Sequence, residues 1–190
     1  MIQVGTFGTS DKRRSFIAID VPAQIKDKLA AACAEIPVAN RPVPKGNMHI
    51  TLFFLGYISD ATIGKVESAM EGLDYGSFGI SVNGLGTFPK GRPDVVFAKI
   101  DSGSEDIARI HGILRDGIGA LGIKLDRRRF TPHITIARIY GLKGKDAVKS
   151  FIGANSGTEF GSFTCMSIKL KLSELGSGGA AHYDLYAKGL

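Results

Sequence analysis

Short apolar runs recur along this chain and are separated by turn residues. Runs of four to eight apolar, β-branched or aromatic residues bounded by Gly, Pro, Asn or Asp are typical of strands. The strongest run is MHITLFFL, residues 48–55, which Gly56 closes. The predicted strands cover residues 14–22, 48–55, 78–88, 95–101, 130–139, 163–172 and 181–187.

A second pattern, in which apolar residues recur every three or four positions, predicts helices between these strands. It is clearest in residues 104–122, whose shared face would carry Ile107, Ile110, Leu114, Ile118 and Leu121. Further helices are predicted over residues 22–36, 60–73 and 144–153, the second of them capped by Ser59. The predicted loops are residues 41–47, the turn 89–94, and the Gly-rich residues 174–182, a flexible hairpin loop that could border a cleft.

The elements follow the order β-α-β-α-β-β and then α-β-α-β-β, which resembles one unit written twice. Strands joined by turns compatible with antiparallel pairing, with few helices, favour an α+β protein over a doubly wound parallel sheet. A chain of 190 residues can bury a sizeable apolar core in one medium domain. We therefore expect a single α+β domain over residues 1–190, with a polar N-terminal tail of about residues 1–13.

Charge changes this picture more than bulk composition does. The hydrophobic fraction of 44% and the charged fraction of 22% are ordinary for a soluble protein, but the formal net charge of +6 indicates a weak attraction to polyanions. The basic excess gathers in residues 124–149, as Lys124, Arg127, Arg128, Arg129, Arg138, Lys143, Lys145 and Lys149. Such a run is usually a solvated face, and beside a candidate site an anion-binding role has about equal weight.

The N-terminus lacks the apolar segment of a signal peptide, and no stretch of the chain is long enough to cross a bilayer. Cys33 and Cys165 have no partner at metal-binding or redox spacing, and we expect both in the core. The expectation is a cytoplasmic protein that does not engage a membrane.

One tetrapeptide pattern occurs twice. His49-Ile-Thr51-Leu and His133-Ile-Thr135-Ile each lie in a predicted strand, and the chain has four histidines in all. Side chains alternate between the two faces of a strand, so each copy would turn its His and Thr to one face and its apolar residues to the other. A single copy would usually be a surface pair, but two copies with identical spacing are hard to attribute to chance.

Two imidazoles and two hydroxyls suit chemistry at a phosphate. Near neutral pH one neutral His can accept a proton while a charged one donates a proton, each contributing about 10²–10⁴ in rate. Thr hydroxyls can donate hydrogen bonds to the nonbridging phosphate oxygens, where charge grows in the transition state. We expect no metal and no cofactor, because neither motif has a further His, Cys or carboxylate at ligand spacing. His111 and His182 are not expected to join the pair, and no Gly-x-Ser-x-Gly elbow supports serine hydrolase chemistry.

With these residues the chain resembles the two-histidine phosphoesterases, and within them the RNA 2′,3′-cyclic phosphodiesterases long called 2′-5′ RNA ligases. The resemblance covers nearly the whole chain and rests on RSFIAIDVP (14–22), NMHITLFFLG (47–56), RRFTPHITIAR (128–138) and LSELGSGGAAHY (172–183). It implies a bilobal α+β fold, in which two lobes related by a pseudo-twofold axis hold antiparallel sheets around a central cleft.

The resemblance also implies roles for residues of this chain. His49 would be the proton donor to the leaving ribose oxygen and His133 the proton acceptor that activates water. Thr51, Thr135 and Arg138 would bind the phosphate, and Phe54 would either stack on a base or pack the lobe. Strict alternation puts Phe54 and Arg138 on the faces opposite the histidines, and a β-bulge or a strand end before each would remove the conflict.

The expected activity is metal-independent hydrolysis of a terminal RNA 2′,3′-cyclic phosphate to a 2′-phosphomonoester, with reversible 2′-5′ ligation as a side reaction. The expected partner is RNA with such an end, including tRNA halves, bound by a monomer. One alternative is a cyclic phosphodiesterase for small cyclic nucleotides or ADP-ribose cyclic phosphate. Another is a non-catalytic RNA-binding module, although binding alone would favour Arg or Lys over two matched histidines.

Overall fold

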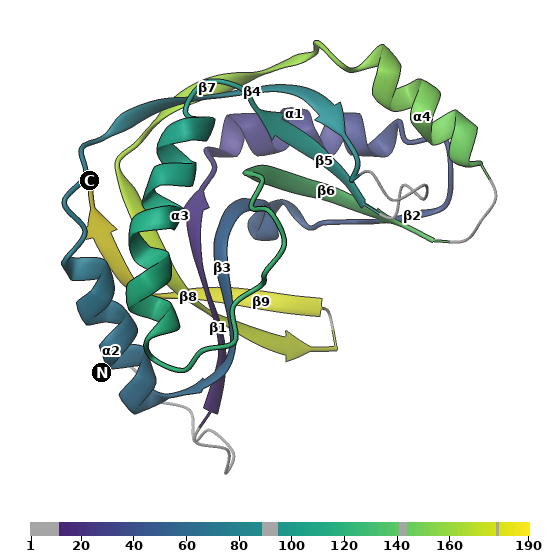
Figure 1. Ribbon diagram of the computed structural model, residues 1–190. Coiled ribbons are helices and arrows are strands. Elements are labelled where there is room, and N and C mark those ends of the chain that lie inside the picture. The colour runs from purple at the N-terminus through teal and green to yellow at the C-terminus, as the bar shows by residue number, and fades with distance from the viewer. Residues whose placement is uncertain (1–11, 89–94, 141–143, 178) are drawn as a thin grey trace, which may run out of the picture.

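The computed structural model describes residues 12–88, 95–140, 144–177 and 179–190 (Figure 1). Its helices are α1 Ala23–Ala34, α2 Asp60–Glu71, α3 Ser104–Gly119 and α4 Lys145–Ala154, with a short 3₁₀ turn, η1 Lys45–Asn47. Its strands are β1 Lys12–Asp20, β2 Asn40–Pro42, β3 His49–Ser59, β4 Phe78–Gly86, β5 Val95–Ile100, β6 His133–Ile139, β7 Glu159–Cys165, β8 Ser167–Gly176 and β9 Gly179–Gly189. The α+β class predicted from the sequence is confirmed.

The strands form one antiparallel sheet in the order β7-β4-β5-β6-β3-β1-β8-β9, with β2 paired to β6. At its centre, β3 and β6 are joined through one pair of residues, Ile50 and Ile134. We call β3, β1, β8 and β9 the first lobe, and β6, β5, β4 and β7 with β2 the second lobe. The two predicted motifs therefore lie on the adjoining strands of the two lobes.

The halves of the chain do not coincide with the lobes. Strands β8 and β9, from the end of the chain, complete the first lobe, and β4, from the first half, lies inside the second lobe. The helices are exchanged between the halves as well. Helices α2 and α3 pack together over β3 of the first lobe, whereas α1 contacts β6 and β7, and α4 contacts β4, in the second lobe (Figure 1). Because each lobe needs strands from both halves, neither half could bury its apolar faces alone.

The core lies between these helices and the sheet. The buried face of α3 carries Ile107, Ile110, Leu114 and Ile118, as the periodicity predicts, and the helix ends at Gly119, before Leu121. Helix α2 begins after Ser59, whose hydroxyl accepts a hydrogen bond from the Thr62 amide at 3.2 Å, which confirms the predicted cap. Within the described residues, no helix is long and apolar enough to cross a membrane.

Three sequence predictions need correction. Residues 163–172 were predicted as one strand, but β7 ends at Cys165 and β8 begins at Ser167, because the chain passes there from the second lobe to the first. The predicted flexible loop 174–182 is mostly strand, since β8 continues to Gly176 and β9 starts at Gly179. The predicted loop 41–47 contains most of β2 and η1.

Two further predictions concern residues that the structure leaves undescribed. The turn 89–94 lies wholly outside the described residues. Of the predicted tail, residues 1–11 also lie outside them, while Lys12 and Arg13 already belong to β1.

Candidate active site

A cavity of about 760 Å³ opens where the two lobes meet. All six residues that the sequence singled out line it: His49, Thr51, Phe54, His133, Thr135 and Arg138. The first three come from β3 of the first lobe and the others from β6 of the second. The structure thus brings the two motifs, more than 80 positions apart in the chain, to one cavity.

The pairing of Ile50 with Ile134 explains this arrangement. The two residues hold equivalent places in the two motifs, and both are fully buried. Because β3 and β6 are antiparallel, His49 lies on the side of Thr135 and Thr51 on the side of His133. These four side chains therefore flank the Ile50–Ile134 pair and point to the opposite face of the sheet. A local twofold relation between the motifs follows.

A β-bulge in each strand settles the position of Phe54 and Arg138. In β3, Thr51 and Phe53 pair with consecutive residues of β1, so Leu52 is the extra residue. In β6, Thr135 and Ala137 pair with consecutive residues of β5, and the extra residue is Ile136. Both bulges lie three positions after the histidine, and each makes two successive residues buried before the chain faces the cavity again.

As a result, Phe54 is 63% exposed at the cavity rather than packed in the core. Arg138 is likewise exposed on the cavity side, directly opposite Arg41 of β2. The conflict with strict alternation is removed by the two bulges, which the spacing of apolar residues alone does not reveal.

The tautomer of His133 follows from one contact. Its Nδ1 lies 2.8 Å from the carbonyl oxygen of Thr131, which can only accept a hydrogen bond, so Nδ1 carries a proton. In the neutral ring, Nε2 is then bare and can accept a proton. Burial lowers the pKa of His133, while the bond to Thr131 partly opposes this, so the ring is neutral at neutral pH.

His49 lies in a more desolvated place. Its ring stacks on that of Phe16, with centroids 4.8 Å apart. Burial is the largest cause that lowers the pKa of His49 to about 4, and Lys171, together with the His182 ring whenever that ring is charged, lowers it further. This imidazole is therefore neutral at neutral pH.

The expectation that neither remaining histidine joins the site is wrong for His182. It lines the cavity from β9, and its ring lies edge-on to that of His49 with centroids 5.3 Å apart. His111 does lie elsewhere, stacked between Phe53 at 4.4 Å and Phe130 at 4.0 Å. The only hint of His182 in the sequence is its place at the end of the Gly-rich segment that was expected to border the cleft.

Two arginines of the cavity also escaped the sequence analysis. Arg14 of β1 lines it and donates a hydrogen bond to the Ser173 hydroxyl at 2.7 Å. Arg41 precedes the first motif in what was predicted as a loop. Of the described basic residues in 124–149, Arg138 alone lines the cavity; Arg128 pairs with Asp126 and Lys149 with Asp146. Lys143 lies outside the described residues.

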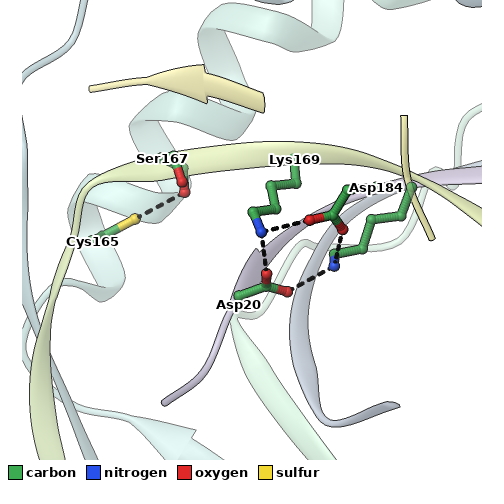
Figure 2. Close-up of polar contacts among 6 residues, drawn as sticks. Asp20, Cys165, Ser167, Lys169 and Asp184 are labelled. Atoms are coloured by element: carbon green, nitrogen blue, oxygen red, sulfur yellow. Dashed lines mark hydrogen bonds and ion pairs between the residues drawn. The ribbon is translucent and has the colours of Figure 1, made fainter. Parts of the chain in front are cut away.

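The first lobe holds a cluster of charged side chains around Asp20, the residue that pairs with His49 across β1 and β3 (Figure 2). Lys169 lies 2.8 Å from Asp20 and 2.6 Å from Asp184, and Lys171 lies 2.9 Å and 2.5 Å from the same carboxylates. Burial would raise the pKa of the Asp20 carboxyl, but hydrogen bonds from the two lysines outweigh it and the pKa is lowered. The cluster thus joins the end of β1, where Asp20 pairs with His49 of β3, to β8 and β9.

The described residues contain no group of three or more His, Cys, Asp or Glu side chains placed to hold a metal ion. Cys33 and Cys165 are buried free thiols, and the Sγ of Cys165 contacts the carbonyl oxygen of Ser167 where β7 passes into β8 (Figure 2). Both cysteines therefore belong to the core, as predicted.

Comparison with known proteins gives the site a context. Residues 26–170 match the sequence model of the 2′-5′ RNA ligase superfamily. The chain is 30% identical over 160 residues to a protein of Aeropyrum pernix named RNA 2′,3′-cyclic phosphodiesterase, covering 84% of this chain and 91% of that protein. A protein of the same name from Escherichia coli is 32% identical over 132 residues, which cover 68% and 73% of the two chains.

Solved structures agree in fold. The crystal structure of LigT from Escherichia coli in complex with 3′-AMP superposes with a TM-score of 0.78 at 24% identity, covering 94% of this chain and 98% of that one. The crystal structure of TT0787 from Thermus thermophilus gives a TM-score of 0.75 at 26% identity, covering 93% and 97%.

Proposed function

Because the chain belongs to the 2′-5′ RNA ligase superfamily, we propose that it is an RNA 2′,3′-cyclic phosphodiesterase that acts through His49 and His133. The substrate is RNA ending in a 2′,3′-cyclic phosphate, and the product is a 2′-phosphomonoester. The observation that carries the proposal is the convergence of both His/Thr pairs on one cavity, from adjoining strands of the two lobes. In-line displacement at phosphorus needs a proton acceptor and a proton donor on opposite sides of the phosphate, and in this proposal His133 and His49 take these two roles.

In the proposed reaction, His133 is the general base. The hydrogen bond from its Nδ1 to Thr131 holds the bare Nε2 ready to take a proton from water. The water oxygen attacks phosphorus, the bond from phosphorus to the 3′-oxygen breaks, and its electron pair goes to that oxygen. His49, as general acid, delivers the proton that this oxygen needs.

To act as general acid, His49 must be protonated, so substrate binding has to favour the charged form of His49. With a pKa of about 4, the His49 imidazole is almost entirely neutral at neutral pH. A bound cyclic phosphate carries a negative charge, and an opposite charge within about 4–6 Å favours the imidazolium. We therefore expect phosphate binding to raise the pKa of His49 and to charge the general acid only when substrate is present.

The remaining residues of the site bind the substrate in this proposal. Thr51 and Thr135 donate hydrogen bonds to the nonbridging oxygens, and Arg138 adds a charge-assisted contact. Phe54, exposed at the cavity, offers its ring face to the terminal base. The same acid and base serve the reverse direction by microscopic reversibility, so 2′-5′ ligation of RNA ends, including tRNA halves, is included as a side reaction.

The charge of the cavity favours RNA over a small cyclic nucleotide or ADP-ribose cyclic phosphate. Besides Arg138, it is lined by Arg14 and Arg41, and cations beyond those needed for one phosphate attract the further phosphates of a chain. An Arg41→Ala variant should lower kcat/KM for an oligonucleotide and flatten its salt dependence, with little effect on a cyclic mononucleotide. Equal losses on both substrates would favour the small-nucleotide alternative.

The deciding experiment uses EDTA and a short RNA with a 2′,3′-cyclic phosphate end. Conversion to the 2′-monoester is compared for the wild type, His49→Ala and His133→Ala, with His111→Gln as a control histidine outside the cavity. We expect turnover by the wild type and the control, and losses of at least about 10²-fold in the two cavity variants. RNA binding without turnover by the wild type would instead establish the non-catalytic RNA-binding module.

A further inference from the structure

Three aromatic rings meet at the first-lobe wall of the cavity. The ring of Phe16 contacts those of His49 and His182, with centroid distances of 4.8 Å in both cases. The two imidazoles lie edge-on at 5.3 Å. His182 therefore lines the cavity beside His49, the expected proton donor, yet the reaction described above gives it no part.

Two hydrogen bonds hold the hairpin that carries His182. The Asn47 side chain, just before the first motif, donates to the carbonyl oxygen of Ala180 at 2.7 Å. Arg14 donates to the hydroxyl of Ser173, which is the direct partner of His182 across β8 and β9. The hairpin is therefore fastened to both neighbouring segments, and the position of His182 against His49 is set by the fold rather than by a free loop.

The two ring nitrogens of His182 differ sharply. Nδ1 is shut off from solvent, and among the described residues it has no hydrogen-bond partner. A buried N–H without an acceptor is rarer in proteins than an under-satisfied acceptor, so the neutral ring keeps its proton on Nε2. The bare nitrogen faces the protein, and the N–H group is the one left for a molecule in the cavity.

The surroundings also keep His182 neutral. Burial lowers its pKa, and the cationic side chains of Lys171 and Arg14 lower it further. A neutral imidazole with an Nε2–H group is a hydrogen-bond donor, not a source of protons. His182 differs from His49 in its charged neighbours: the Asp20 carboxylate favours the charged form of His49, whereas burial, Lys171 and Arg14 all oppose the charged form of His182.

We propose that His182 is a third catalytic imidazole of this site, whose Nε2–H donates a hydrogen bond to a substrate phosphate oxygen on the His49 side. This rests on the proposed function. The donor acts where negative charge grows as the bond to the leaving oxygen lengthens, while His49 transfers the proton. It adds a donor to those of Thr51, Thr135 and Arg138, from a strand that carries neither motif.

The opposing explanation is that His182 only packs on Phe16, and substitutions separate the two. His182→Phe keeps an aromatic ring and removes the donor. His182→Gln removes the ring but places an amide N–H near the position of Nε2. His182→Asn places its amide nearer to the position of Nδ1. Tyr183→Phe, an exposed neighbour on the same hairpin, serves as the control.

The assay is kcat/KM on the RNA with a 2′,3′-cyclic phosphate end, together with the dissociation constant for inorganic phosphate and the melting temperature. We expect His182→Phe to lose about 10- to 100-fold in kcat/KM at an unchanged melting temperature, and His182→Gln to retain more activity than Phe or Asn. Phosphate affinity should follow the same order. If Phe retains full activity and Gln does not, His182 is a packing residue and the inference is wrong.

Because phosphate affinity can be measured without turnover, the role of His182 can be tested independently of the proposed function. Should the wild type fail to turn over the RNA, the proposed function fails, but the order of the three variants in phosphate affinity still decides the role of His182. Should the wild type turn over while phosphate affinity and kcat/KM are the same in His182→Phe and the wild type, the inference alone fails.

Discussion

Ile50 and Ile134 lie directly opposite each other at the junction of the two lobes, each one residue after a histidine of the cavity. Both are fully buried, so the same contact that closes the core between the lobes orients His49 and His133 on the other face. The site is therefore built on the most central strands of the sheet and not on loops. Side chains on such strands are held more exactly than side chains on loops.

The exposed ring of Phe54 should matter for binding and not for folding. Phe54→Ala should raise KM for the RNA substrate by the equivalent of about 1–3 kcal/mol, the usual contribution of one base stacked on an aromatic ring. The same substitution should change the free energy of unfolding of the protein by no more than about 0.5 kcal/mol, because the Phe54 ring is 63% exposed. Tyr57→Ala is the matched control, since Tyr57 is 62% exposed on the same strand but does not line the cavity. Equal effects of the two substitutions would remove Phe54 from the site.

The Thr hydroxyls should act mainly in the transition state. Thr51→Val and Thr135→Val keep the shape of the side chain and remove the donor, so each should lower kcat by about 10²-fold with a smaller effect on KM. Thr164→Val, on the exposed face of β7, should leave both constants unchanged. Single-turnover kinetics with the three variants provides the measurement. A rise in KM at constant kcat would mean that the hydroxyls bind substrate and transition state equally.

The buried state of His49 should make stability depend on pH. In the unfolded chain the pKa of His49 returns to its ordinary value of 6.5, whereas in the folded chain it is about 4, so the unfolded state binds more protons between these values. The associated stability is fully present above pH 6.5 and is lost as the pH falls toward 4, by up to about 3 kcal/mol. Urea unfolding at pH 7 and pH 4.5 should therefore show a smaller acid loss in His49→Gln than in the wild type. Parallel pH profiles would contradict the desolvated position of His49.

The charge cluster around Asp20 should contribute more to the free energy of unfolding than an exposed surface ion pair does. Lys171 is 8% exposed, and its replacement by Met would leave the carboxylates of Asp20 and Asp184 with one lysine between them. Because the side chains of Asp20 and Asp184 are 39% and 44% exposed, water can partly replace the lost lysine, so the free energy of unfolding should fall by about 1–3 kcal/mol, less than for a fully buried pair. Lys45→Met breaks the exposed pair with Asp27 and should change it by less than about 1 kcal/mol. Chemical denaturation of both variants checks the contrast, and equal values would show that the cluster is solvated.

Much of the site could be predicted from the sequence because its signals are local. The repeat of His and Thr two positions apart, in runs with strand character, is enough to put His49 with Thr51 and His133 with Thr135 on polar faces of strands. The α+β class follows from the order of elements in the same way. Phe54 and Arg138 could not be placed, because the bulges at Leu52 and Ile136 depend on pairing with β1 and β5. His182, Arg14 and Arg41 were missed because no local pattern marks them.

The sequence by itself determined that His49 with Thr51 and His133 with Thr135 lie on polar faces of strands, since alternation over three residues is a property of immediate neighbours. Only the tertiary structure decided that β3 and β6 are adjacent, that β8 and β9 return to the first lobe, and that His182 meets His49 there. These relations join residues far apart in the chain, and they arise because each lobe buries its apolar face only with strands from both halves. The protonation of the three cavity histidines depends on the same packing, since burial is the largest cause of every one of their pKa shifts.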